Sequence, residues 1–208
     1  MPNPGIALVL SAPSGAGKST LIALLRKDFP DFCYSVSCTT RPPRAQEIDG
    51  VDYHFIDRAT FEQRKDAGYF AEWAQVHGNY YGTPIEPVRH ALAEGHNLLF
   101  DIDVQGAKQL KQSLPEALFV FIVPPSIAEL AKRLQGRGAD SKETIAKRLA
   151  NATQEISEAT WYDALIVNDD LSKAYESLRC LVCAKALAPN RQTTLLQNLM
   201  QEGASWLN

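Results

Sequence analysis

The stretch that decides the fold of this chain is Leu8-Val9-Leu10-Ser11-Ala12-Pro13-Ser14-Gly15-Ala16-Gly17-Lys18-Ser19-Thr20. An apolar run leads into small and glycine residues, and leucines follow at helical spacing at positions 21, 24 and 25. This order is typical of a buried parallel strand, a loop and a helix. Glycines in such a loop let backbone N–H groups surround phosphate oxygens at a helix N-terminus, whose dipole favours anions. The stretch therefore predicts a phosphate-binding loop.

The loop departs from the pattern G-x-x-x-x-G-K-[ST] because Ala12 stands where the first glycine belongs. Alanine is the mildest substitution there and removes no functional group. In the mechanism behind the pattern, Lys18 reaches the β- and γ-phosphates and the Ser19 hydroxyl ligates magnesium. A glycine-rich turn with an exposed lysine is the alternative, but strand, spacing and helix all favour the phosphate loop. We expect ATP to be bound by Ala12, Pro13, Ser14, Gly15, Ala16, Gly17, Lys18, Ser19 and Thr20.

Length and composition indicate one globular domain, since 208 residues with 45% hydrophobic content can bury a substantial core. The 24 acidic and 21 basic residues give a net charge of -3, which provides no electrostatic footprint for nucleic acid or an anionic membrane. No apolar run approaches the roughly 20 residues that span a bilayer, and the N-terminus lacks signal-peptide features. We expect a small substrate, no nucleic-acid or membrane partner, and a cytoplasmic location.

Three further segments carry candidate chemistry. Arg41 and Arg44 lie in a proline-containing loop and are suited to grip a phosphate through forked donors. Residues 97–103 predict a buried strand with Asp101 and Asp103 at its carboxyl end, where ligands of a parallel sheet collect. Residues 133–140 combine two glycines with two arginines, which favours a hinged lid. Taken singly, each segment is also compatible with an ordinary surface loop or strand end.

Two features near the C-terminus are open to more than one interpretation. Cys180 and Cys183 form a C-x-x-C motif that suggests zinc or redox chemistry, but their helical surroundings favour apolar packing. After Pro189, leucines 195, 196 and 199 recur at helical spacing. We expect this tail helix to cover the core. A contact that joins copies of the chain in a homo-oligomer is the alternative.

The chain resembles the guanylate kinases from about residue 6 to residue 185. The resemblance rests on motifs in the right order at residues 11–19, 37–47, 50–55, 72–74, 78–83, 100–106, 133–138 and 166–170. It implies an α/β fold, with a P-loop nucleoside triphosphate hydrolase-type parallel sheet flanked by helices. It also implies a core of residues 1–36, 97–125 and 150–208, a small α/β GMP-binding insert at 37–96 and a helical lid at 126–149.

The resemblance further implies direct in-line phosphorylation of GMP, and of dGMP, by ATP, in purine nucleotide metabolism and GMP recycling. The GMP-binding residues would be Ser37, Arg41, Arg44, Glu47, Tyr53, Glu72, Tyr81, Thr83 and Asp101. Guanine presents adjacent N1–H and N2–H donors, which a carboxylate such as Glu72 complements. Ser19 and Asp101 would hold Mg²⁺, partly through water. The catalytic residues would be Lys18, Arg41, Arg137 and Arg148.

Two other functions are weighed against this one. A guanylate-kinase-like interaction module keeps the fold without catalysis, but such modules typically lose the phosphate loop and lid arginines that this chain retains. A kinase for another monophosphate is disfavoured because Glu72 would face the unprotonated N1 of adenine.

Overall fold

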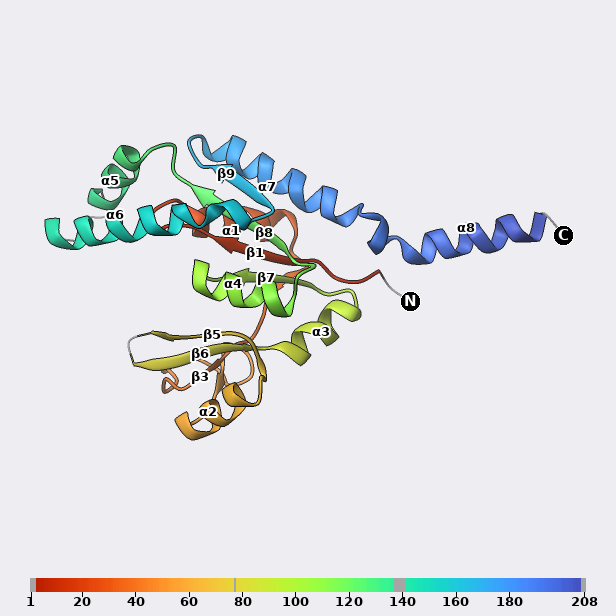
Figure 1. Ribbon diagram of the computed structural model, residues 1–208, viewed down its shortest axis with the longest axis horizontal. Coiled ribbons are helices and arrows are strands. Elements are labelled where there is room, and N and C mark those ends of the chain that lie inside the picture. The colour runs from red at the N-terminus through yellow and green to blue at the C-terminus, as the bar shows by residue number, and fades with distance from the viewer. Residues whose placement is uncertain (1–2, 77, 137–140, 207–208) are drawn as a thin grey trace.

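The computed structural model describes residues 3–76, 78–136 and 141–206 (Figure 1). Within them, the central sheet has five strands in the order β2-β7-β1-β8-β9, and all neighbouring strands are parallel. These strands are β1 (Ala7–Ser11), β2 (Phe32–Tyr34), β7 (Asn97–Asp101), β8 (Leu118–Val123) and β9 (Ala164–Val167). Helices cover both faces of this sheet, which confirms the predicted α/β class.

Strand β1 lies at the centre of the sheet and contributes to two hydrophobic cores. Ala7 and Val9 pack in the core shared with α3 (Ile85–Ala93) and α4 (Val104–Ser113). Leu8 and Leu10 pack in the core shared with α1 (Lys18–Asp28) and α7 (Leu171–Ala186). Because side chains alternate across a strand, a strand covered on both faces must be apolar throughout. This explains the continuous apolar run before the phosphate loop.

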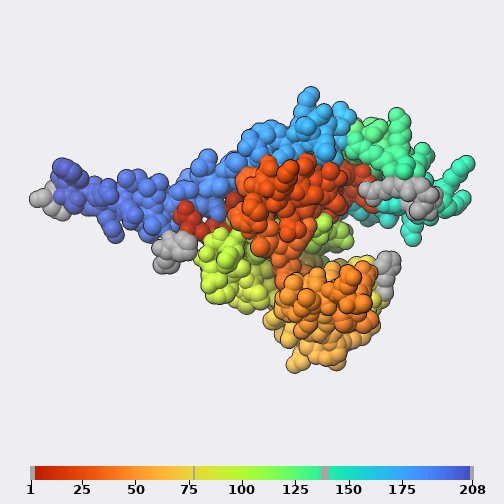
Figure 2. Space-filling model, turned by 180° about the vertical axis from the view of Figure 1, so that it is seen from behind, coloured from red at the N-terminus to blue at the C-terminus, as the bar shows by residue number. Residues whose placement is uncertain are grey.

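A second sheet lies within residues 38–84, in the order β4-β3-β6-β5. Its elements are β3 (Cys38–Thr39), β4 (His54–Phe55), α2 (Arg58–Asp66), β5 (Phe70–Val76) and β6 (Asn79–Pro84). The ring of Phe61 is fully buried and stacks on Phe70 and Tyr80, with centroids 4.4 and 5.0 Å away. Strands β5 and β6 pair antiparallel, and His77, which lies between them in the sequence, is outside the described residues. Figure 2 shows this sheet as a lobe set off from the core.

Helices α5 (Ile127–Gln135) and α6 (Lys142–Ser157) pack on each other through the buried residues Leu130, Leu134 and Ala152. Near its C-terminal end, α6 returns to the central core, where Ile156 packs. A one-turn helix, η1 (Ala159–Trp161), then leads into β9. Helix α6 therefore joins the α5–α6 pair to the core.

The C-terminal tail contradicts the expectation that it covers the core. Helix α8 (Thr193–Trp206) buries no residue, and Leu199, Met200 and Trp206 are 54%, 75% and 89% exposed. It points away from the body of the molecule (Figures 1 and 2). The short helix η2 (Pro189–Arg191) separates α7 from α8, and Arg191 donates from Nη1 to the Gly5 carbonyl (2.6 Å) just before α8 begins. No described helix is both long and apolar enough to cross a membrane.

The expectation that the C-x-x-C cysteines pack against the core is also wrong. Cys180 and Cys183 are both exposed free thiols on α7, whose buried face is formed by Ala174, Leu178 and Val182. A three-residue spacing places both thiols on the outer side of the helix. Among the described residues there is no group of three or more His, Cys, Asp or Glu side chains placed to hold a metal ion.

Candidate nucleotide-binding site

The phosphate loop joins β1 to α1 in a conformation that depends on glycine. Gly15 and Gly17 have φ angles of 93° and 95°, in the left-handed region that other residues rarely adopt. The Ala16 N–H donates to the Pro13 carbonyl (3.0 Å) and closes the loop on itself. Lys18 then begins α1, so the loop ends where the unpaired N–H groups of the helix begin.

A cavity of about 340 Å³ lies against this loop. It is lined by Ala12, Pro13, Ser14, Gly15, Gly17, Lys18, Ser19, Thr20, Asp103 and Glu155. All the residues predicted to bind ATP therefore border one cavity except Ala16, which is fully buried.

Lys18 lies next to the carboxyl end of β7. Its Nζ is 2.5 Å from Oδ1 of Asp101 and 3.5 Å from the carbonyl oxygen of Ile102. The parallel pairing of β1 with β7 aligns Leu10 with Asp101, which brings the end of that strand to the base of the loop. The structure thus places the strand-end Asp101 beside the loop lysine.

Two further carboxylates line the same cavity. Asp103 caps α4 by accepting from the Gly106 N–H (2.8 Å). Glu155 reaches the cavity from α6, and burial, together with the nearby Asp103, raises the pKa of its carboxyl although Lys18 opposes the shift. The hydroxyl of Ser19 and these carboxylates form an all-oxygen donor set. Such a set fits Mg²⁺, which keeps several waters and needs few protein ligands beside substrate phosphates.

The second sheet holds a buried carboxylate in a chain of hydrogen bonds. Glu72 on β5 is 7% exposed and is paired across the strands with Thr83 on β6. Thr83 donates from Oγ1 to Oε1 of Glu72 (2.6 Å), and its hydroxyl lies 3.1 Å from that of Ser37. Burial is the main reason that the pKa of Glu72 is raised. The hydrogen bond from Thr83 lowers this pKa, and the negative charge of the nearby Asp103 raises it further. The structure thus brings Ser37, Glu72 and Thr83 together as one polar group.

A cavity of about 420 Å³ lies between the two sheets. The predicted residues Ser37, Tyr53, Thr83 and Asp101 line it, together with residues of β7 such as Leu99 and Phe100. Glu72 does not line this cavity and is connected to it through Thr83. Asp101 borders this cavity and also pairs with Lys18, so the space beside the second sheet adjoins the phosphate loop.

The arginine loop is held in place by Glu47. Its carboxylate accepts from Nη2 of Arg41 (2.8 Å) and from the backbone N–H of Arg44 (2.7 Å). The hydrogen bond from Arg41 is the main reason that the pKa of Glu47 is lowered. The Arg41 guanidinium also lies over the Tyr53 ring, 5.6 Å from its centroid, and Tyr53 is in edge contact with Tyr81. Glu47 therefore orients Arg41.

One of the two predicted lid arginines can be placed. Arg148 on α6 donates from Nη2 to the Ser14 hydroxyl of the phosphate loop (2.5 Å). The α5–α6 pair thus touches the loop directly. Arg137, the other predicted catalytic arginine, lies outside the described residues.

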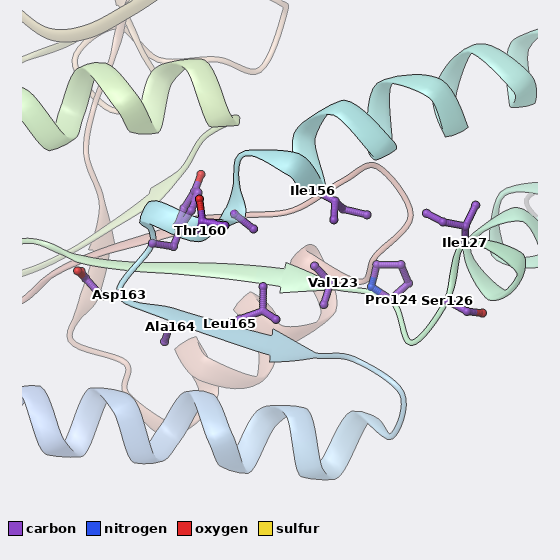
Figure 3. Close-up of a pocket in the computed structure, with 11 residues that line it drawn as sticks. Val123, Pro124, Ser126, Ile127, Ile156, Thr160, Asp163, Ala164 and Leu165 are labelled. Atoms are coloured by element: carbon purple, nitrogen blue, oxygen red, sulfur yellow. The ribbon is translucent and has the colours of Figure 1, made fainter.

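Another cavity, of about 620 Å³, lies elsewhere (Figure 3). It lies where α5 and α6 meet the ends of β8 and β9, and Val123, Ile127, Ile156 and Leu165 contribute apolar walls. No arginine or lysine lines it. Of these cavities, the one against the phosphate loop has such a cationic donor in its lining, Lys18.

Sequence reasoning gave no role to two residues of the site. No sequence motif singles out Glu155, although it follows Arg148 by seven residues and therefore lies on the same face of α6. Asn168 is buried and donates from Nδ2 to the Ala16 carbonyl in the phosphate loop (2.7 Å). It stands in the sequence motif at residues 166–170, but that motif does not reveal its partner.

The fold and site define a P-loop nucleotide kinase: a parallel sheet with a phosphate loop, a second sheet with its own polar pocket, and a helical pair that touches the loop. The guanylate kinase family model matches residues 5–185. The chain belongs to the guanylate kinase family.

Individual relatives agree with this assignment. The guanylate kinase of Lawsonia intracellularis is 53% identical over 197 residues, which are 95% of this chain and 93% of that protein. The guanylate kinase of Oleidesulfovibrio alaskensis is 53% identical over 201 residues, which are 97% and 98% of the two chains. The crystal structure of guanylate kinase from Anaplasma phagocytophilum matches with a TM-score of 0.69 at 32% identity, covering 96% of this chain and 95% of that one.

Proposed function

We propose that this protein transfers the γ-phosphoryl group of ATP to GMP, and also to dGMP, in purine nucleotide metabolism and GMP recycling in the cytoplasm. The observation that carries the proposal is the buried Glu72–Thr83–Ser37 group beside a cavity that adjoins the phosphate loop. We assign residues 37–96 to a GMP-binding insert, residues 126–149 to a lid and the remaining residues to the core.

The polar group suits guanine better than adenine. A Glu72 carboxylate accepts from both N1–H and N2–H of guanine, while the hydroxyls of Ser37 and Thr83 can donate or accept. Adenine would set an unprotonated N1 against the carboxylate and leave a buried acceptor unpaired. Sites built on such hydrogen bonds reject the mismatched analogue by roughly 10⁴-fold.

The GMP phosphate is assigned to Arg41, Arg44, Tyr53 and Tyr81. Glu47 keeps the Arg41 guanidinium oriented, so its forked donors are in place before a phosphate binds. The planar fork of arginine fits two phosphate oxygens at once. This arrangement supports a site for a monophosphate at the edge of the second sheet.

Catalysis then consists of positioning and charge neutralisation. The attacking group is a GMP phosphate oxygen, which is already nucleophilic and needs no general base. Lys18, Arg41, Arg137 and Arg148 surround the transferring phosphoryl group once the insert and lid close around the two nucleotides. Closure also excludes water, which would otherwise compete as the acceptor.

Ser19 and Asp101 are the proposed Mg²⁺-holding residues, partly through water. Ser19 lines the loop cavity, and Asp101 borders the adjoining cavity beside Lys18. A bound ion would supply positive charge that offsets the negative charge of the ATP phosphates. Asp101 also keeps the Lys18 ammonium at the cavity edge.

Titration calorimetry with GMP and AMP tests the substrate assignment. The proposal predicts that GMP binds at least about 100-fold more tightly than AMP, since one buried acceptor stays unpaired with adenine. Equal affinities would show that the pocket does not select guanine and would favour a kinase for another monophosphate.

A further inference from the structure

Asn168 is a buried polar residue at the back of the phosphate loop. It directly follows β9, and its backbone N–H donates to the Val123 carbonyl at the end of β8 (2.8 Å). Its side chain, in a residue only 6% exposed, donates from Nδ2 to the Ala16 carbonyl (2.7 Å). The ends of β8 and of the edge strand β9 therefore hold an amide donor against the loop from the side of the core.

The partner of this hydrogen bond belongs to the peptide unit that joins Ala16 to Gly17. No described peptide bond is cis, so the Ala16 C=O and the Gly17 N–H point in opposite directions within one plane. A donor that fixes the carbonyl on the core side thereby turns the Gly17 N–H to the other side. Gly17 lines the loop cavity, which is the proposed place of the phosphates.

We propose that Asn168 is a positioning residue that orients the Ala16–Gly17 peptide so that the Gly17 N–H donates to a phosphate oxygen of ATP. This inference rests on the proposed function of the loop. Asn168 should therefore affect the binding of ATP and not the binding of GMP, because the Asn168 side chain contacts the phosphate loop and not the second sheet.

The close packing of Gly17 against Asn168 supports this positioning role. A Cβ added to Gly17 would lie 2.2 Å from Nδ2 of Asn168, far inside van der Waals contact. The φ of 95° also disfavours any side chain at this position. The amide of Asn168 therefore occupies the room that a larger residue at position 17 would need, and the two residues form one packed unit.

The side chain of Asn168 is not needed to cap the N-terminus of α7, because Asp170 does so. Asp170 caps that helix by accepting from the Lys173 N–H (2.9 Å). The backbone link of Asn168 to Val123 does not depend on the side chain. What remains for the amide is the contact with the loop.

The test uses two variants of the full-length protein. Asn168→Ala removes the amide, and Asn168→Leu removes the donor while keeping most of the volume. The Kd values of ADP with Mg²⁺ and of GMP are measured by titration calorimetry, and Tm by scanning calorimetry. Both variants are expected to bind ADP roughly 10-fold more weakly or worse, with an unchanged Kd for GMP and a raised KM for ATP.

Asn97→Ala is the matched control. Asn97 also bonds a backbone group across the sheet, accepting from the Ile6 N–H (2.7 Å), but at the opposite end of the strands from the loop. It is expected to lower Tm without changing the Kd of ADP. If both Asn168 variants lose stability as Asn97→Ala does and still bind ADP with the wild-type Kd, the positioning role is wrong. A wild-type protein that binds neither ADP nor GMP would instead overturn the proposed function.

Discussion

Replacing Glu72 by glutamine should affect protein stability and GMP affinity in different ways. The carboxylate is 7% exposed, accepts from Thr83 at 2.6 Å, and has its pKa raised mainly by burial. A buried charge costs free energy, and glutamine removes that charge while its Oε1 still accepts from Thr83. We therefore expect the free energy of unfolding at neutral pH to stay the same or to rise.

The affinity for GMP should change in the opposite direction. Two hydrogen bonds from guanine to a charged acceptor contribute about 1.5–3 kcal/mol each. Glutamine keeps one neutral acceptor and sets an NH₂ donor against a guanine donor, which costs roughly 2–4 kcal/mol, or about 30- to 1,000-fold in Kd.

Titration calorimetry with GMP and a thermal melt of the same samples measure both effects. Glu62→Gln is the control, because it changes the net charge by the same amount as Glu72→Gln. Glu62 lies on α2 in an exposed ion pair with Arg58. A Glu72→Gln protein that binds GMP within threefold of the wild type would refute the role given to this carboxylate.

Four other changes have defined outcomes. Lys18→Ala should lower kcat by about 10²–10³-fold, because it removes a cation from the transferring phosphoryl group; rates near wild type in a steady-state assay would contradict this. The affinity for GMP should rise with pH as Glu72 loses its proton, because guanine needs the charged carboxylate. The pKa of Glu72 is raised, so this rise lies above the usual glutamate range, and the affinity then levels off. Calorimetry across pH should show no such rise in Glu72→Gln. Phe61→Ala should destabilise the second sheet by about 3–5 kcal/mol in denaturant melts and weaken GMP binding more than ADP binding. Truncation after Gln192 should leave kcat and Tm unchanged, because α8 buries no residue; a fall in either would show that the tail supports the core.

The parts of the site that could be predicted from sequence are local. The strand, loop and helix around Lys18 are contiguous, so their spacing alone predicts a phosphate loop, and the structure contains it. The hairpin of β5 and β6 brings Glu72 and Thr83 together across neighbouring strands, within reach of a short-range pattern.

The remaining contacts join segments that no local pattern relates. Asn168 meets Ala16 across 152 positions of the sequence, and Arg148 meets Ser14 across 134. Neither pairing can be read from spacing, because it depends on how β9 and α6 return to the loop. The same limit explains the tail: the apolar spacing of α8 predicts a helix but does not indicate which surface, if any, covers it.

The central claim is that phosphate loop and guanine pocket act together as an ATP-dependent GMP kinase. The most direct test is a coupled assay of ADP release from ATP and Mg²⁺, with GMP, dGMP, AMP, UMP and CMP offered in turn and Lys18→Ala as the impaired control. The account predicts ADP release with GMP, weaker release with dGMP, none above background with the other three, and release from the variant about 10²–10³-fold slower than from the wild type. Binding of GMP without ADP release would contradict it and identify the chain as an interaction module that has kept the pocket and lost phosphoryl transfer.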